Sequence, residues 1–167
     1  MRNSGCFELA AVGDINTYAL FAELGRRSLA PTGRAGMILP TGIATDDTTK
    51  AFFGDVIRRH SLVRLAGFEN ESFIFPSVHH SYKFCTFTIA GSATSVDVAD
   101  FVFFCRSVDQ VGDAERHFNL TPETVGLLNP NTRTCPIFRT HRDAELTTQI
   151  YDSTPVLAND HASSNPW

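Results

Sequence analysis

The sequence lacks the features that would place it at once in a large functional class. None of its 167 residues belongs to an apolar run of 18 or more, so no membrane span is predicted. The first residues carry one arginine and a broken apolar stretch, and do not resemble a secretory signal peptide. Positive charge is also scarce, because 14 Lys and Arg stand against 18 Asp and Glu. A net charge of −4 excludes a generally basic nucleic-acid-binding surface and leaves only a local basic patch open.

Metal-binding and redox motifs are missing as well. The four cysteines are Cys6, Cys85, Cys105 and Cys135. No two of them have the two-residue spacing of a zinc knuckle or a thioredoxin-like motif. Cys85 and Cys105 lie inside apolar runs, which predicts buried, reduced thiols and a cytoplasmic protein. No metal site is predicted at His79 and His80, because adjacent side chains diverge on a strand and no third ligand follows at a regular spacing.

A glycine-rich phosphate loop is absent too. The nearest match, 33–36, precedes an expected strand, whereas phosphate-binding loops follow a strand and open a helix. A nucleotide-binding α/β enzyme is therefore disfavoured.

The sequence does have the composition of a packed α/β chain, with 43% apolar residues, 19% charged residues and 14 Phe. The length predicts one domain or a piece of one. Periodicity and breaker residues predict helices at 15–29, 46–60, 107–118, from 121 onwards and 142–151, and strands at 36–40, 62–68, 82–90 and 100–106. The strand at 36–40 has no polar face, which predicts a fully buried strand of a parallel sheet. Because the pattern begins with a helix, we expect a fragment whose first strands lie elsewhere.

The segment 13–42 reads GDINTYALFAELGRRSLAPTGRAGMILPTG. It contains an N-x-Y-x-x-F helix (Asn16, Tyr18, Phe21), a turn at 31–33 and an apolar strand that ends at Pro40. This order resembles the γ-type N6-adenine DNA methyltransferases of type II and type IIG restriction-modification enzymes and phage-defence methylases. Four later blocks are also similar, in the same order: TGIATDDTTKAFF, GFENE, FPSVHHSYKFC and LNPNTRTCPIF.

The resemblance implies the C-terminal half of a Rossmann-like S-adenosylmethionine-dependent methyltransferase sheet, followed by a mixed α/β extension. The implied divisions are an arm (1–13), the second half of the catalytic domain (14–92), an extension toward the target-recognition region (93–157) and a frayed tail (158–167). It also implies that the strand at 82–90 runs antiparallel between two mutually parallel strands, 35–39 and 62–68. The alternation within 82–90 is compatible with either direction.

The family transfers a methyl group from S-adenosylmethionine to N6 of an adenine flipped out of the duplex, without a metal. By resemblance, Phe75 and Pro76 form the element that stacks on this adenine. The alternative is that Phe75 is a core residue. His79, His80 and Lys83 would lie near the DNA backbone, and a solvated loop is the alternative reading for them.

By the same resemblance, Asn16, Tyr18 and Phe21 would contact the cofactor. A simple helix cap is the alternative for Asn16, for which Asp14 is a second candidate, and packing is the alternative for Phe21.

Two family motifs are missing, namely the cofactor glycine loop and the Asn-Pro-Pro-aromatic tetrapeptide that holds the target amine. The segments 129–131 and 165–167 lack the second proline and follow the Phe75 block, so no catalytic residue is assigned. We expect the isolated chain to be inactive and not to bind S-adenosylmethionine tightly. Its implied partners are double-stranded DNA and the missing N-terminal part of the same enzyme. The alternative is a non-catalytic α/β binding or interaction module that partners a complete methylase.

Overall fold

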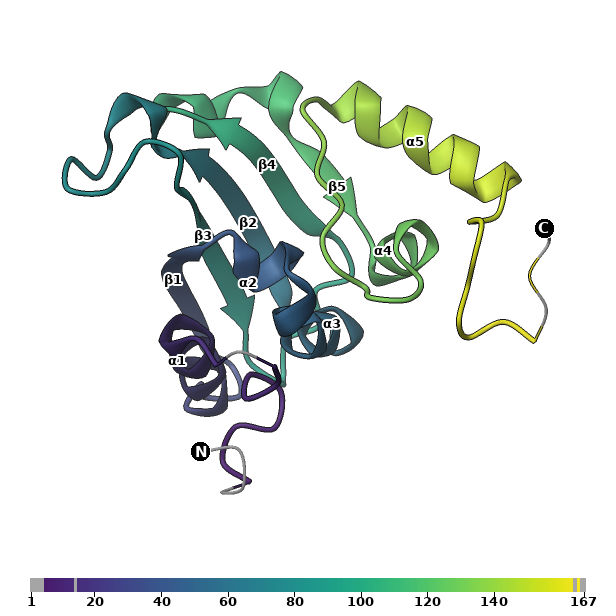
Figure 1. The fold of residues 1–167 in the computed structure, drawn as a ribbon, viewed down its shortest axis with the longest axis horizontal. Helices are drawn as coiled ribbons and strands as arrows, with labels where there is room; N and C mark the ends of the chain where they lie inside the picture. Colours follow the sequence, from purple (N-terminus) through teal and green to yellow (C-terminus); the bar gives the residue numbers. More distant parts are fainter. Residues whose placement is uncertain (1–4, 14, 164, 166–167) are drawn as a thin grey trace.

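The computed structural model describes residues 5–13, 15–163 and 165, and contains a five-stranded mixed sheet with helices against it (Figure 1). The strands are β1 (Arg34–Pro40), β2 (Leu62–Glu69), β3 (Lys83–Ala90), β4 (Ala99–Cys105) and β5 (Phe118–Leu120). The α-helices are α1 (Thr17–Arg27), α2 (Gly42–Thr45), α3 (Lys50–Arg58), α4 (Pro122–Leu128) and α5 (His141–Ser153). Short 3-10 turns are η2 (Asp47–Thr49), η3 (Asn70–Ser72), η4 (Asp109–Gly112) and η5 (Ala114–Arg116).

The strand order is β1-β3-β2-β4-β5. β3 lies between β1 and β2 and is antiparallel to both, so β1 and β2 run in the same direction. The prediction of a reversed strand between two parallel ones is therefore confirmed. β4 continues the sheet parallel to β2, and β5 closes it antiparallel to β4.

The core lies where α1, α2 and α3 cover one face of the sheet (Figure 1). Phe52 and Phe53 of α3 have no exposed surface, and their rings lie 6.2 and 6.5 Å from the ring of Phe87 in β3. Burying a phenylalanine side chain contributes about 1.5–3 kcal/mol, so these rings hold α3 onto the sheet. Gly67 of β2 is required by close packing, because a Cβ there would lie 2.4 Å from the ring of Phe103.

The prediction of a fully buried strand at 36–40 is wrong. β1 is an edge strand, and its exposure alternates along the strand from exposed Arg34 to exposed Pro40. Leu39 is buried against the helices, whereas Ile38 is 62% exposed on the opposite face. A run of apolar residues does not show which face will be covered, and here helices cover only one.

The predicted helix at 107–118 is also wrong, because this segment forms η4, η5 and the start of β5. The side chain of Asp113 accepts a hydrogen bond from the Glu115 N–H, which closes a tight turn and not a continuing helix. Phe118 then enters a strand, where its ring stacks 5.5 Å from that of Phe101. Burial of this aromatic pair outweighs the weak helical periodicity of the segment.

The remaining helices agree with the sequence in type and differ at their ends. The predicted 46–60 helix is α3, which begins only at Lys50 because Asp46 has an extended backbone. α4 begins as expected, with Pro122 in its first turn and the Thr121 hydroxyl accepting from the Thr124 N–H. None of the helices in the described part of the chain is both long and apolar enough to cross a membrane. Cys85 and Cys105 are free and buried, as predicted.

Candidate functional site in the loop between β2 and β3

The residues predicted to contact DNA come together in one loop, which we call the β2–β3 loop (70–82), and at the first residue of β3. The loop leaves the carboxyl end of β2, and in α/β sheets ligands bind beyond the carboxyl ends of the parallel strands. The loop and the start of β3 carry Phe75, Pro76, His79, His80 and Lys83. The fold therefore places these five residues at the end of the sheet where a binding site is expected.

Asn70 organises this loop, although it was not among the residues predicted from the sequence. It has no exposed surface. Its amide nitrogen donates to the carbonyls of Phe75 (3.0 Å) and Val78 (2.8 Å), and its amide oxygen accepts from the Phe75 N–H (2.9 Å). Its own N–H donates to the Tyr82 carbonyl (3.2 Å). An Asn that directly follows a strand and opens a turn-rich segment is the signal that could have identified it.

Phe75 is partly packed and partly open. Its ring stands edge-on to Phe84, with centroids 4.8 Å apart and an angle of 76°. Phe84 in turn stacks on Phe68 at 5.0 Å. Phe75 remains 38% exposed, so one side of the ring is supported while the rest can receive a ligand. The loop geometry is thus compatible with an aromatic platform, whereas a core residue would be buried.

Two further aromatic residues of the loop were missed by the sequence analysis. Phe73 has a left-handed backbone, with φ of 52°, and its side chain is exposed. Tyr82 is exposed at the other end of the loop. Left-handed backbone is uncommon outside glycine, so the turn directs the Phe73 ring outward at a conformational cost.

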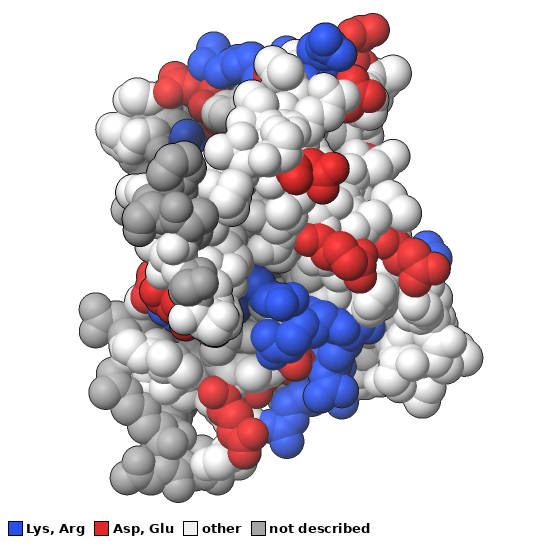
Figure 2. Space-filling view, turned by 90° about the vertical axis from the view of Figure 1, so that its right-hand side faces the viewer, with Lys and Arg blue, Asp and Glu red and all other residues white. Residues whose placement is uncertain are grey.

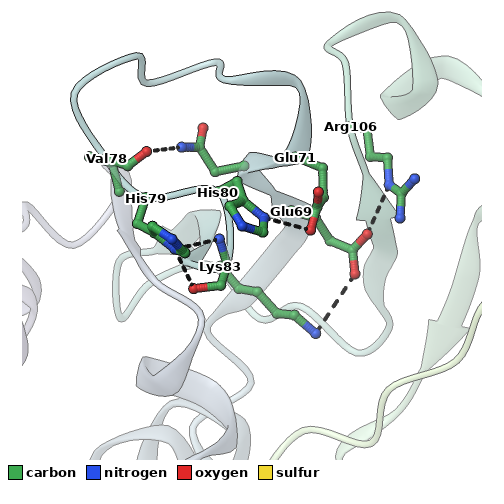
Figure 3. Close-up of polar contacts among 9 residues, drawn as sticks. Glu69, Glu71, Val78, His79, His80, Lys83 and Arg106 are labelled. Carbon is green, nitrogen blue, oxygen red and sulfur yellow. Dashed lines mark hydrogen bonds and ion pairs between the residues drawn. The ribbon is translucent and has the colours of Figure 1, made fainter.

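His79 and His80 lie side by side, which corrects the expectation that adjacent side chains diverge. Their ring centroids are 4.4 Å apart because the pair lies in a turn and not on a strand. Nδ1 of His79 lies 2.8 Å from the Ser81 hydroxyl, and Nδ1 of His80 lies 3.2 Å from a Glu71 carboxylate oxygen (Figure 3). Within 5–13, 15–163 and 165, no group of three or more His, Cys, Asp or Glu side chains could hold a metal ion.

Lys83 is not an isolated cation. Its Nζ lies 3.8 Å from one Glu69 carboxylate oxygen, and Arg106 Nε lies 3.0 Å from the other (Figure 3). Two cations therefore share one carboxylate, and Glu71 in the loop brings the formal charge of these four side chains to zero. Arg106, at the end of β4, was also missed, because only the sheet brings it next to β2.

The three residues predicted to contact the cofactor lie at the start of α1. Asn16 occupies the N-cap position of α1, as the cap alternative predicts, but its side chain makes no capping hydrogen bond. Phe21 is 66% exposed, so the packing alternative is also wrong. Burial raises the pKa of Tyr18, and the neighbouring Asp46 and Cys85 raise it further. Asp14, the other candidate cap, lies outside the described residues.

Tyr18 lies on the helix-covered side of the sheet. It packs against the core, and buried Cys85 of β3 is among the groups that raise its pKa. The sequence alone did not relate the start of α1 to β3.

Comparisons with known proteins leave the family open. No family model matches the chain, and no curated protein matches its sequence. Among solved structures, one similar chain is the type IIG restriction endonuclease BpuSI, with 19% sequence identity and a TM-score of 0.44. The match covers 60% of this chain and 11% of that one, so this chain spans about a tenth of that enzyme's length. A likeness at this level establishes neither family nor function.

Proposed function

We propose that this chain forms part of the catalytic domain of an adenine-specific DNA methyltransferase of a restriction-modification system, with the β2–β3 loop against the flipped adenine. The observation that carries the proposal is the order β1-β3-β2 with β3 reversed, which the sequence resemblance implies for this enzyme family. The loop with exposed aromatic rings stands at the carboxyl end of β2, where such an enzyme needs its target-base contacts.

In this proposal Phe75 stacks on the extruded adenine, with Pro76 beside it. Stacking of a base on an aromatic ring is worth about 1–3 kcal/mol, which offsets part of the cost of flipping the base. Phe84 supports the ring from behind, and Asn70 fixes the loop backbone on both sides of Phe75. Lys83 and the two histidines face the DNA backbone, where their N–H groups donate to phosphate oxygens.

The described residues do not fit a complete S-adenosylmethionine site. Three groups can contact part of the cofactor: the exposed ring of Phe21, the side-chain amide of Asn16, which makes no capping hydrogen bond, and the hydroxyl of Tyr18. The glycine loop and the Asn-Pro-Pro-aromatic tetrapeptide are missing from the sequence. The chain alone should therefore transfer no methyl group. Incorporation of tritiated methyl into DNA, or micromolar cofactor binding by calorimetry, would contradict this expectation.

The base-stacking role can be tested with two labelled duplexes, one with a single bulged adenine and one with an abasic bulge at the same position. We expect the chain to bind the adenine bulge about 5- to 150-fold more tightly by fluorescence anisotropy, which is 1–3 kcal/mol at 1.4 kcal/mol per tenfold. Phe75→Ala should remove this preference. Phe73→Ala, in the same loop, is the matched control and should keep it.

The same assay distinguishes the base-stacking role from a second candidate function, a non-catalytic module that partners a complete methylase. That candidate is favoured by the outer edge of β1. The Thr41 N–H and the Gly33 carbonyl form hydrogen bonds with the β3 side. Backbone groups alternate in direction along a strand, so the N–H and C=O groups of the even-numbered residues of β1 point away from the sheet. Such an edge can receive a strand from a partner. Equal affinity for both duplexes, or no binding to either, would overturn the base-stacking proposal. The non-catalytic module would then remain as the candidate function.

A further inference from the structure

Four arginines gather at the end of the sheet opposite the β2–β3 loop. Arg26 comes from α1, Arg58 and Arg59 come from the end of α3, and Arg133 comes from the loop after α4. Figure 2 shows Lys and Arg side chains forming one continuous group on the lower half of this side of the molecule. We call these four residues the arginine patch.

The carboxylate of Asp55 lies inside the arginine patch. Asp55 is largely buried, and its oxygens lie 2.6 Å from Arg26, 3.3 Å from Arg58 and 3.1 Å from Arg59. The Arg26 side chain is nearly as buried as Asp55, so these two neutralise each other inside the protein. Arg58 is 50% exposed and Arg59 is 70% exposed, and each gives Asp55 only part of its donor capacity. Their remaining N–H groups face solvent.

Arg133 lies next to Arg58, close to two glycines of α3 and α4. Its φ of 52° is left-handed, and its N–H donates to the Asn129 carbonyl at 2.8 Å. A Cβ on Gly54 would lie 3.6 Å from the Arg133 Cβ and 3.5 Å from Nη1 of Arg58. A Cβ on Gly126 would lie 3.7 Å from the Arg133 guanidinium carbon. These distances place Arg133 against both α3 and α4, next to the guanidinium of Arg58.

The Arg133 guanidinium has no ion pair or side-chain hydrogen bond among the residues that the structure describes. A left-handed backbone outside glycine costs free energy, and such strain is usually found where it serves a function. No exposed large apolar side chain lies on the described parts of α3 or α4. The part of the patch on α3 and α4 is therefore polar and cationic, which favours a charged ligand over an apolar one.

The arginine patch is separate from the candidate base site. β2 starts three residues after Arg59 and ends at the β2–β3 loop, and its eight residues span about 25 Å at roughly 3.3 Å each. The two sites lie at opposite ends of the same strand. The phosphates of a straight duplex that contact one site are therefore not the phosphates that contact the other.

We infer that the arginine patch binds phosphate groups of a nucleic-acid backbone, independently of base recognition by the loop. Guanidinium groups match phosphate oxygens with paired N–H donors, and at least Arg58, Arg59 and Arg133 have donors to offer. The inference goes beyond the proposed function and does not require it, since a phosphate contact needs no flipped adenine.

The test is the salt dependence of binding to a fully paired labelled duplex longer than one helical turn. For Arg58→Gln combined with Arg133→Gln, the slope of log affinity against log salt should fall by about 1.8, at about 0.9 per phosphate contact. Arg139→Gln combined with Arg142→Gln removes the same charge elsewhere on the surface and should leave the slope unchanged. An equal fall in both variants would show a general charge effect and overturn the patch.

Three further measurements separate the alternatives. Lysine at positions 58 and 133 keeps the charge, so Arg58→Lys with Arg133→Lys should retain most of the slope and controls for a folding defect. Millimolar inorganic phosphate at constant ionic strength should not displace the duplex, and displacement would identify free phosphate as the ligand instead. Phe75→Ala should leave this binding unchanged even if the base-stacking proposal fails. A loss with Phe75→Ala would show that the patch is not a separate site.

Discussion

Each end of the sheet is organised around one buried polar side chain, but the two differ in kind. At the carboxyl end of β2, Asn70 is neutral and fully buried, and all its side-chain hydrogen bonds go to the backbone of one loop. At the other end, Asp55 is charged and bonds to arginine side chains from two helices. The first arrangement shapes a loop, whereas the second joins α1 to α3.

The difference determines how each end responds to its surroundings. An amide that bonds to carbonyl and N–H groups does not titrate and is little affected by salt. Burial acts to raise the pKa of Asp55, but the hydrogen bonds and charges of Arg26 and Arg59 outweigh it and hold the pKa below its ordinary value. The Asn70 hydrogen bonds should therefore be insensitive to pH and salt, and the α1–α3 end should weaken in acid.

Among the variants that test this comparison, leaving the controls aside, the largest effect is expected from Asn70→Ala, which should lower the free energy of unfolding by about 3 kcal/mol. Three side-chain hydrogen bonds are lost, at roughly 1 kcal/mol each. Urea denaturation measures the change, and amide exchange at Phe75 should accelerate. Asn119→Ala, on the exposed side of β5, is the control and should change stability by less than about 0.5 kcal/mol. Equal effects of the two variants would mean that the loop does not depend on Asn70.

Asp55→Ala should cost about 2 kcal/mol, between the values for exposed and for fully buried ion pairs. The cost arises because Arg26 is left mostly buried without its carboxylate. Asp47→Ala breaks the exposed pair with Lys50 and should cost less than about 0.5 kcal/mol. If Asp55→Ala were as mild as Asp47→Ala, the α1–α3 contact would rest on apolar packing alone.

The pH dependence of stability should distinguish Asp55 from Asn70, because only Asp55 titrates. Because the pKa of Asp55 is lowered on folding, its contribution is fully present above the ordinary value of 3.8 and is lost as the pH falls through the lower folded value. The wild type should lose stability on acidification through this range, and Asp55→Asn should lose less. Asn70→Ala should show the wild-type pH slope in thermal melts. A slope that Asp55→Asn does not change would contradict the comparison.

Leaving the controls aside, the smallest effect on the free energy of unfolding is expected for Phe75→Ala, at about 0.5–1.5 kcal/mol, because the partly exposed ring mainly loses its edge contact with Phe84. Phe101→Ala in the core should cost about 3–5 kcal/mol by leaving a cavity. Phe75→Trp should be tolerated. Thermal melts of the three variants distinguish a ligand-facing ring from a core residue. If Phe75 were a core residue, Phe75→Ala would lower the melting temperature as much as Phe101→Ala does.

Local pattern was sufficient for much of the secondary structure. The helix that begins after Thr121 has its cap and proline within four residues, and α5 likewise begins with a capping box formed by Thr140 and Asp143. Such signals are complete within one turn of the chain, so a sequence can reveal them. The reversed direction of β3 came from the family resemblance, because alternation along a strand is the same in both directions.

The candidate site was only partly accessible to sequence reasoning. Phe75, His79, His80 and Lys83 lie within nine residues of each other, so one motif found them together. Arg106 was missed because it lies far from Glu69 along the chain. Only the pairing of β4 with β2 brings the two side chains together.

By itself the sequence determined which segments form most of the helices and strands, because caps, breakers and periodicity act over a few residues. Only the tertiary structure decided that β1 is an exposed edge, that 107–118 ends in a strand against Phe101, and that Arg133 lies beside Arg58. Each of these outcomes depends on which distant segment covers a face or fills a space. That choice is made by burial summed over the whole chain and not by any local pattern.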